Sequence, residues 1–71
     1  MSNQKISIVV NGQPTDVPAD LSVLALLGHL NIEPSTVAVE LNREIVRKPA
    51  WPGTQVQDGA RIEIVQFVGG G

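Results

Sequence analysis

The chain has 71 residues, of which 42% are apolar, and this size and composition describe one small globular domain. It contains no cysteine and one histidine, which excludes disulfides and thiolate zinc sites and leaves too few reactive side chains for a self-contained enzyme. The net charge is −2 and only Arg47 and Lys48 are adjacent cations, which argues against nucleic-acid binding because that function needs clustered basic residues.

The N-terminal segment predicts a strand followed by a tight hairpin. Residues 6–10 place branched apolar side chains at every second position, a period typical of a half-buried strand. Asn11-Gly12 follows, and this dipeptide favours a type I′ turn because both of its positions need a positive φ. Residues 13–17 form the second strand, and two nearby prolines place it at a sheet edge or end it early. The opening apolar run is too short for a signal peptide or a membrane span, so we expect a cytoplasmic protein without a membrane partner.

The next segment predicts one amphipathic helix. Ser22 or Asp20 caps its N-terminus, because a side-chain oxygen at that position accepts a hydrogen bond from a free backbone N–H. The spacing i, i+3, i+4, i+7 gives one apolar stripe, made of Val23, Leu26, Leu27 and Leu30. Leu24 lies off this stripe and is expected to be partly exposed, and Pro34 prevents a longer helix.

Three further strands are predicted after the helix, over residues 37–41, 45–47 and 61–67. Residues 49–57, between the last two strands, are predicted to be irregular, with Trp51 and Val56 as core anchors, and Asp58-Gly59 forms the turn before the last strand. The element order is therefore β-β-α-β-β-β, with one apolar helix stripe to cover one face of a sheet. This order predicts an α+β fold of the β-grasp, or ubiquitin-like, type, with a mixed sheet of four to five strands and the first and last strands paired at its centre. A small open barrel is the alternative that shares these strands.

The titratable residues offer no convincing catalytic or metal site. His29 is interpreted as a solvated residue near a helix C-terminus, without a second ligand or base close to it in the sequence. The carboxylate pairs Glu40 with Glu44 and Asp16 with Asp20 fall on predicted strand and turn positions, where water solvates them. We therefore expect no metal and no catalytic residue in the chain.

The last strand predicts an exposed apolar surface. If Ile62 and Ile64 face the helix, then Val65 and Phe67 face solvent, because neighbouring side chains point to opposite faces. Val9 joins them if the first and last strands pair. An apolar patch on a sheet is a candidate surface for docking a partner protein. The alternative is a bulge that turns Phe67 inward.

The chain ends in Gly69-Gly70-Gly71, which directly follows this strand and which we expect to form a flexible tail on a domain of residues 1–68. Three interpretations are open: an end without a role, an artificial end of the expressed sequence, or a reactive C-terminus. Glycines carry no Cβ, so an extended leader of this kind fits a narrow catalytic channel. A carboxylate is a poor electrophile, and it is usually activated as an acyl-adenylate with ATP on a separate enzyme.

The chain resembles the ThiS-type sulfur-carrier proteins of thiamine biosynthesis over nearly its whole length. The matching stretches are residues 8–12, 23–27, 37–42 with 45–46, Trp51, and above all the C-terminal run 58–71. The resemblance implies that an E1-like adenylyltransferase uses ATP and Mg²⁺ to adenylate the carboxylate of Gly71. Sulfur from a cysteine-desulfurase relay would then replace AMP, leaving a thiocarboxylate from which thiazole synthase takes the sulfur.

On this reading the protein is a substrate and carrier, not an enzyme, and binds no cofactor itself. Gly70 would permit entry into the channel and Gly69 would add reach, while Val65 and Phe67 would dock the partner. We expect a monomer when the carrier is free. The alternatives are a sulfur carrier of the kind found as the small subunit of molybdopterin synthase, a ubiquitin-like modifier joined to lysines through Gly71, and an interaction module with an inert tail.

Overall fold

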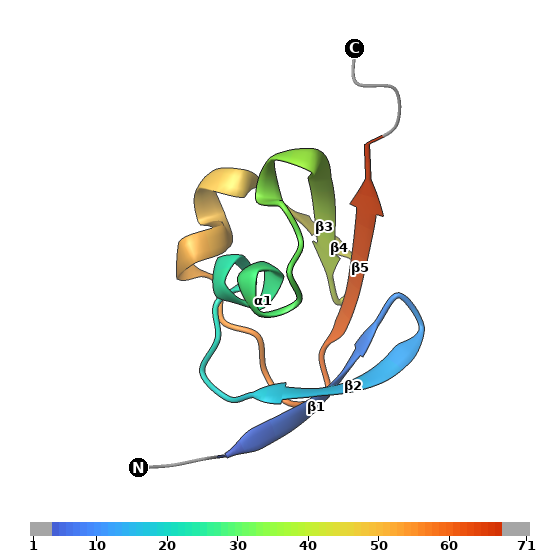
Figure 1. Ribbon diagram of the computed structural model, residues 1–71, viewed down its shortest axis with the longest axis vertical. Coiled ribbons are helices and arrows are strands. Elements are labelled where there is room, and N and C mark those ends of the chain that lie inside the picture. The colour runs from blue at the N-terminus through green and yellow to red at the C-terminus, as the bar shows by residue number, and fades with distance from the viewer. Residues whose placement is uncertain (1–3, 68–71) are drawn as a thin grey trace.

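Five strands form one mixed sheet in the computed structural model, which describes residues 4–67 (Figure 1). The strands are β1 (Lys5–Val10), β2 (Gln13–Pro18), β3 (Val37–Leu41), β4 (Glu44–Val46) and β5 (Arg61–Gln66). Their order across the sheet is β2-β1-β5-β3-β4. The β1–β5 pair is parallel and the other pairs are antiparallel, so the first and last strands meet at the centre as predicted.

The hairpin between β1 and β2 follows the turn chemistry of its sequence. Val10 pairs with Gln13, and the two residues between them have positive φ angles, 49° for Asn11 and 83° for Gly12. Asparagine and glycine tolerate this conformation better than other residues, which explains the position of the turn. β2 lies at one edge of the sheet, where its prolines remove no hydrogen bond to a further strand.

Two asparagine side chains extend the hydrogen bonding of the central strand. The Asn11 Oδ1 atom accepts from the Ile64 N–H at 2.7 Å, and its Nδ2 atom donates to the Ile64 carbonyl at 3.1 Å. On the other side of β5, the Asn42 Oδ1 atom accepts from the Arg61 N–H at 2.9 Å. The last backbone hydrogen bond from β1 to β5 is donated by the Asn11 N–H to the Ile62 carbonyl at 2.8 Å, and the Asn11 side-chain amide continues this ladder by one further step.

The helix α1 (Val23–His29) covers one face of the sheet (Figure 1). Ser22 is its N-cap, with the Oγ atom accepting from the Ala25 N–H at 3.1 Å, and Asp20 does not cap it. The apolar stripe faces the sheet as predicted, with Val23, Leu26 and Leu27 buried. Leu30 is half-buried at the C-cap, and Leu24 is 39% exposed on the side away from the stripe.

The prediction of an irregular segment after β4 is wrong in its first part. Residues 48–53 form the 3₁₀-helix η2 (Lys48–Gly53), and a shorter one, η1 (Pro34–Thr36), precedes β3. A proline near the start of each helix is compatible with it, because the first N–H groups have no partner within the helix. η2 inserts Trp51 into the core, where the indole Nε1 donates to the Val46 carbonyl at 2.7 Å.

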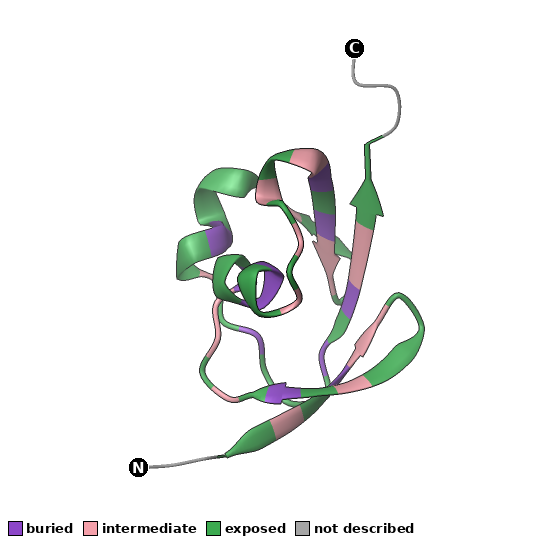
Figure 2. Cartoon of the chain, in the orientation of Figure 1, coloured by how far each residue is buried: buried purple, intermediate pink, exposed green. Residues whose placement is uncertain are grey.

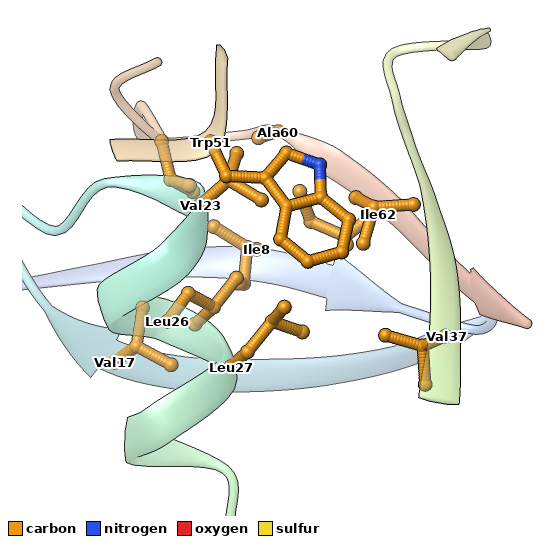
Figure 3. Close-up of a cluster of buried hydrophobic side chains, with 11 residues drawn as sticks. Ile8, Val17, Val23, Leu26, Leu27, Val37, Trp51, Ala60 and Ile62 are labelled. Atoms are coloured by element: carbon orange, nitrogen blue, oxygen red, sulfur yellow. The ribbon is translucent and has the colours of Figure 1, made fainter. Parts of the chain in front are cut away.

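The core lies between α1, η2 and the covered face of the sheet (Figures 2 and 3). Its buried members are Ile8, Val17, Val23, Leu26, Leu27, Val37, Val39, Trp51, Val56, Ala60 and Ile62. Trp51 and Val56 are the anchors expected from the sequence. Within residues 4–67 the five strands form one sheet with α1 across one face (Figure 1), so the fold is the predicted β-grasp and not the alternative, a small open barrel. The predicted boundary at residue 68 and the tail Gly69–Gly71 lie outside the described residues.

Candidate functional site

The C-terminal end of β5 is where the chain leaves the sheet toward the glycine run. The Phe67 N–H donates to the Thr36 carbonyl at 2.8 Å, one residue beyond the end of β5. This end of β5 lies near η1 and η2 and far from the start of β1 (Figure 1). The glycines at positions 69–71 lie outside the described residues, and the structure describes the chain that leads to them as far as Phe67.

An apolar patch lies beside this end of β5, on the face of the sheet away from α1. We name it the outer patch, and it consists of Ala38, Ile45 and Val65. Val65 pairs with Ala38 across β5 and β3, while Ile45 pairs with Glu40 across β4 and β3. The three patch residues line one shallow depression together with the carboxylate-bearing side chains Glu40 and Glu63.

The exposure of the patch is unusual for large apolar side chains. Val65 is 60% exposed and Ile45 is 74% exposed, although both are in strands of the sheet. The colours of Figure 2 show the same change along β5, from buried near its start to exposed at its end. Exposed apolar surface that is flanked by charged residues is typical of protein–protein contact sites.

Phe67 is exposed as predicted, but its ring has a neighbour that the sequence did not indicate. The ring is 56% exposed, and the Lys48 Nζ atom lies 5.6 Å from its centroid. The same nitrogen lies 5.9 Å from the centroid of Trp51. Phe67 therefore sits beside η2, at the end of the sheet.

Val9 does not join the outer patch. It pairs with Arg61 at the start of β5, four residues before Val65. At about 3.3 Å per residue this separation is roughly 13 Å along the strand. Val9 is half-buried, and it shares the outer face without being adjacent to Val65.

Ile45 is the patch residue that the sequence reasoning missed. Ile45 and Val46 are adjacent and equally apolar, so a strand of three residues does not say which of them faces the core. Val46 packs against the core, and Ile45 consequently points outward. The sequence carried no signal that decides between them; the strand register does, because Val46 pairs with the buried Val39 and so shares its face.

The titratable residues stay apart in the described part of the chain. His29, Asp16, Asp20 and Glu44 are exposed, and Glu40 is half-buried. Among residues 4–67, no three of the histidine, aspartate and glutamate side chains gather closely enough to hold a metal ion. In the same range, no helix has the length and apolar character needed to cross a membrane.

The fold and the exposed end of its central strand define a ubiquitin-like β-grasp protein that presents its C-terminal segment. Residues 3–71 match the family model described as the ThiS family, and the chain belongs to this family. The crystal structure of the thiamine biosynthesis protein ThiS from Geobacter metallireducens superposes with a TM-score of 0.82 and 38% sequence identity. That match covers 93% of this chain and 100% of the Geobacter chain.

Relatives of two different sizes contain a sequence similar to that of this chain. A thiazole synthase from Paramagnetospirillum magneticum is 44% identical over 66 residues, which is 93% of this chain but 20% of that protein. This chain thus spans about a fifth of that relative's length. The protein ycf40 of Porphyra purpurea is 34% identical over 71 residues, the full length of both chains.

Proposed function

We propose that this chain carries sulfur as a thiocarboxylate on Gly71 and donates it for thiazole formation. The observation that best supports the proposal is the end of β5, where a central strand leads toward the glycine run beside an exposed apolar patch. Gly71 follows Phe67 by four residues, so its carboxylate lies at most about 14 Å from that residue in a fully extended chain. The folded domain thereby keeps the reactive group close to a surface that a partner recognises.

The proposed chemistry requires a separate activating enzyme. A carboxylate oxygen of Gly71 attacks the α-phosphate of ATP, and pyrophosphate leaves, which converts the poor electrophile into an acyl-adenylate. The terminal sulfur of a persulfide supplied by a cysteine-desulfurase relay then attacks the carbonyl carbon and displaces AMP, which gives an acyl disulfide. A thiol reduces the S–S bond of this intermediate and leaves the sulfur on Gly71 as a thiocarboxylate. ATP and Mg²⁺ bind to the E1-like adenylyltransferase in this scheme, and the chain acts as a substrate and not as a catalyst.

The glycine run fits this role because a catalytic channel for a peptide terminus must enclose the backbone closely. Gly70 lets the chain enter without a Cβ, and Gly69 adds reach. The outer patch and Phe67 dock the domain on the adenylyltransferase and later on thiazole synthase. The thiazole synthase of Paramagnetospirillum magneticum, part of which resembles this chain, supports that second partner.

Intact-mass analysis tests the proposed chemistry. The chain is incubated with the adenylyltransferase, ATP, Mg²⁺ and a sulfur donor, and we expect a mass gain equal to the replacement of one oxygen by sulfur. An unchanged mass, with an enzyme that is active on another carrier, contradicts the proposal. Sulfur transfer to thiazole synthase, and not to the large subunit of molybdopterin synthase or as a lysine conjugate, identifies the acceptor.

Charged substitutions in the outer patch test its role in docking. Ile45→Lys and Val65→Lys are each expected to raise the KM of the adenylyltransferase for this chain about 10-fold, because apolar anchors carry much of an interface's binding energy. Both side chains are more than half exposed, so the free energy of unfolding should change by less than about 0.5 kcal/mol. Pyrophosphate release and chemical denaturation measure the two effects.

Leu24→Lys is the matched control for these variants. Leu24 is also a large apolar residue that is exposed, but it lies on α1, which covers the opposite face of the sheet. We expect its KM to equal that of the unmodified chain. If the KM values of Ile45→Lys and Val65→Lys also equal that of the unmodified chain, the outer patch does not dock the enzyme.

A further inference from the structure

Lys48 links the base of the glycine run to the core. Its Nζ atom lies 5.6 Å from the centroid of the Phe67 ring and 5.9 Å from the centroid of the Trp51 ring. The same nitrogen donates to the Ser35 carbonyl over a long contact of 3.5 Å. A cation within about 6 Å of an aromatic ring is attracted by the electrons of the ring face. The Lys48 side chain therefore connects η2 with η1 and with Phe67, the residue that follows β5.

The two aromatic rings differ in how firmly they are held. Trp51 is 2% exposed, and its indole N–H donates to the Val46 carbonyl, so its ring is fixed within the core. Phe67 is 56% exposed, and its backbone N–H donates to the Thr36 carbonyl. That hydrogen bond holds the Phe67 backbone, whereas the neighbour of the ring is the exposed Lys48 side chain of η2.

We propose that Lys48 is a positioning residue that fixes the direction in which the chain leaves β5. This inference rests on the proposed function, in which Gly71 enters the active site of an adenylyltransferase. A Phe67 that is held at both backbone and ring has fewer orientations to lose when the enzyme binds. Less conformational entropy is then lost when the carboxylate enters the active site, and kcat/KM rises.

The positioning role of Lys48 requires the positive charge of its side chain. Glutamine at position 48 is polar but uncharged, so it is not attracted to two ring faces at once. Arginine keeps the charge and stacks well on aromatic rings. Lys5→Gln is the control for charge alone, because Lys5 is an exposed lysine at the start of β1, at the far end of the molecule (Figure 1).

Amide hydrogen exchange tests the structural half of the proposal without any partner. In Lys48→Gln, the exchange rate of the Phe67 N–H is expected to rise about fivefold, the effect of losing the cation–π contact with the Phe67 ring. Lys48→Arg and Lys5→Gln should keep the original rate. The Ile64 N–H, which donates to Asn11 within the sheet, should exchange equally in all four proteins. Equal Phe67 rates in Lys48→Gln and the unmodified chain overturn the proposal.

Adenylation kinetics test the functional half with the same four proteins. We expect Lys48→Gln to lower kcat/KM about fivefold while the chain stays folded at the assay temperature, and Lys48→Arg to restore it. A lower kcat/KM without faster Phe67 exchange would mean that Lys48 contacts the enzyme directly, which also overturns the proposal, as does faster exchange with unchanged kcat/KM. If the unmodified chain is not adenylated at all, the proposed function fails and with it the positioning role, while the exchange rates still decide whether Lys48 holds Phe67.

Discussion

Replacing Gly70 with valine is expected to lower the rate of adenylation at least about 100-fold, the cost of displacing a reacting group by roughly 1 Å. In the proposed function, the branched side chain adds bulk at a position that enters the narrow channel of the enzyme. Gly70 lies beyond the last described residue, Phe67, and supplies no side chain to the core. The melting temperature of the variant should therefore equal that of the unmodified chain. Pyrophosphate release measures the adenylation rate.

Gly28→Val is the matched control for this substitution. Gly28 is an exposed residue of α1, and a Cβ added there meets no atom within 4 Å. Valine and glycine are both weak helix formers, so α1 should change in stability by less than about 1 kcal/mol. We expect normal adenylation of Gly28→Val. Normal adenylation of Gly70→Val as well would refute the narrow-channel argument.

Replacing Trp51 with alanine is expected to cost about 3–5 kcal/mol of unfolding free energy. Trp51 is 2% exposed, and its ring packs among core residues from α1 and the sheet (Figure 3). Stabilities of roughly 0.05–0.15 kcal/mol per residue leave a domain of this size with little reserve. We therefore expect the variant to be largely unfolded at 37 °C. Circular dichroism during urea denaturation measures the loss, because the substitution removes the single tryptophan.

Trp51→Phe separates packing from hydrogen bonding at this position. Phenylalanine keeps an aromatic ring in the core but leaves the Val46 carbonyl without the indole N–H that now donates to it at 2.7 Å. The cost should be smaller than for alanine, about 1–3 kcal/mol for the lost hydrogen bond and the smaller ring. A loss below about 1 kcal/mol in Trp51→Ala would show that the core does not depend on this ring.

The elements that depend on local chemistry could be predicted from the sequence. Asn11-Gly12 defines the first hairpin because two successive positive φ angles leave few alternatives to these residue types. The spacing of Val23, Leu26 and Leu27 gives α1 and the face that it buries. Together with the alternating strands, these features were sufficient for the β-grasp.

The features that depend on distant parts of the chain could not be predicted. The hydrogen bonds of Asn11 to Ile64 join residues 53 positions apart, and the sequence indicated only the turn. η2 has no apolar period that distinguishes a 3₁₀-helix from an irregular segment. The contact of Lys48 with Phe67 likewise requires η2 and the end of β5 to be placed first.

The candidate site was predictable to different degrees. Alternation along the last strand indicated that Val65 and Phe67 are exposed, which the structure confirms. Ile45 was missed and Val9 lies apart from the patch, because both positions depend on strand register across the sheet. The reactive role of Gly71 remains a prediction from the sequence and the family, since the described residues end at Phe67.

The central position of β5 has a mechanical consequence. An enzyme that draws the chain beyond Phe67 into its active site exerts tension along the axis of this strand. β5 is hydrogen-bonded to β3 on one side and to β1, with the Asn11 side chain, on the other. Such a pull loads the bonds on both sides together in shear, whereas an edge strand would have bonds on one side only to resist it. The domain should therefore keep its shape through repeated insertion and withdrawal of its C-terminus.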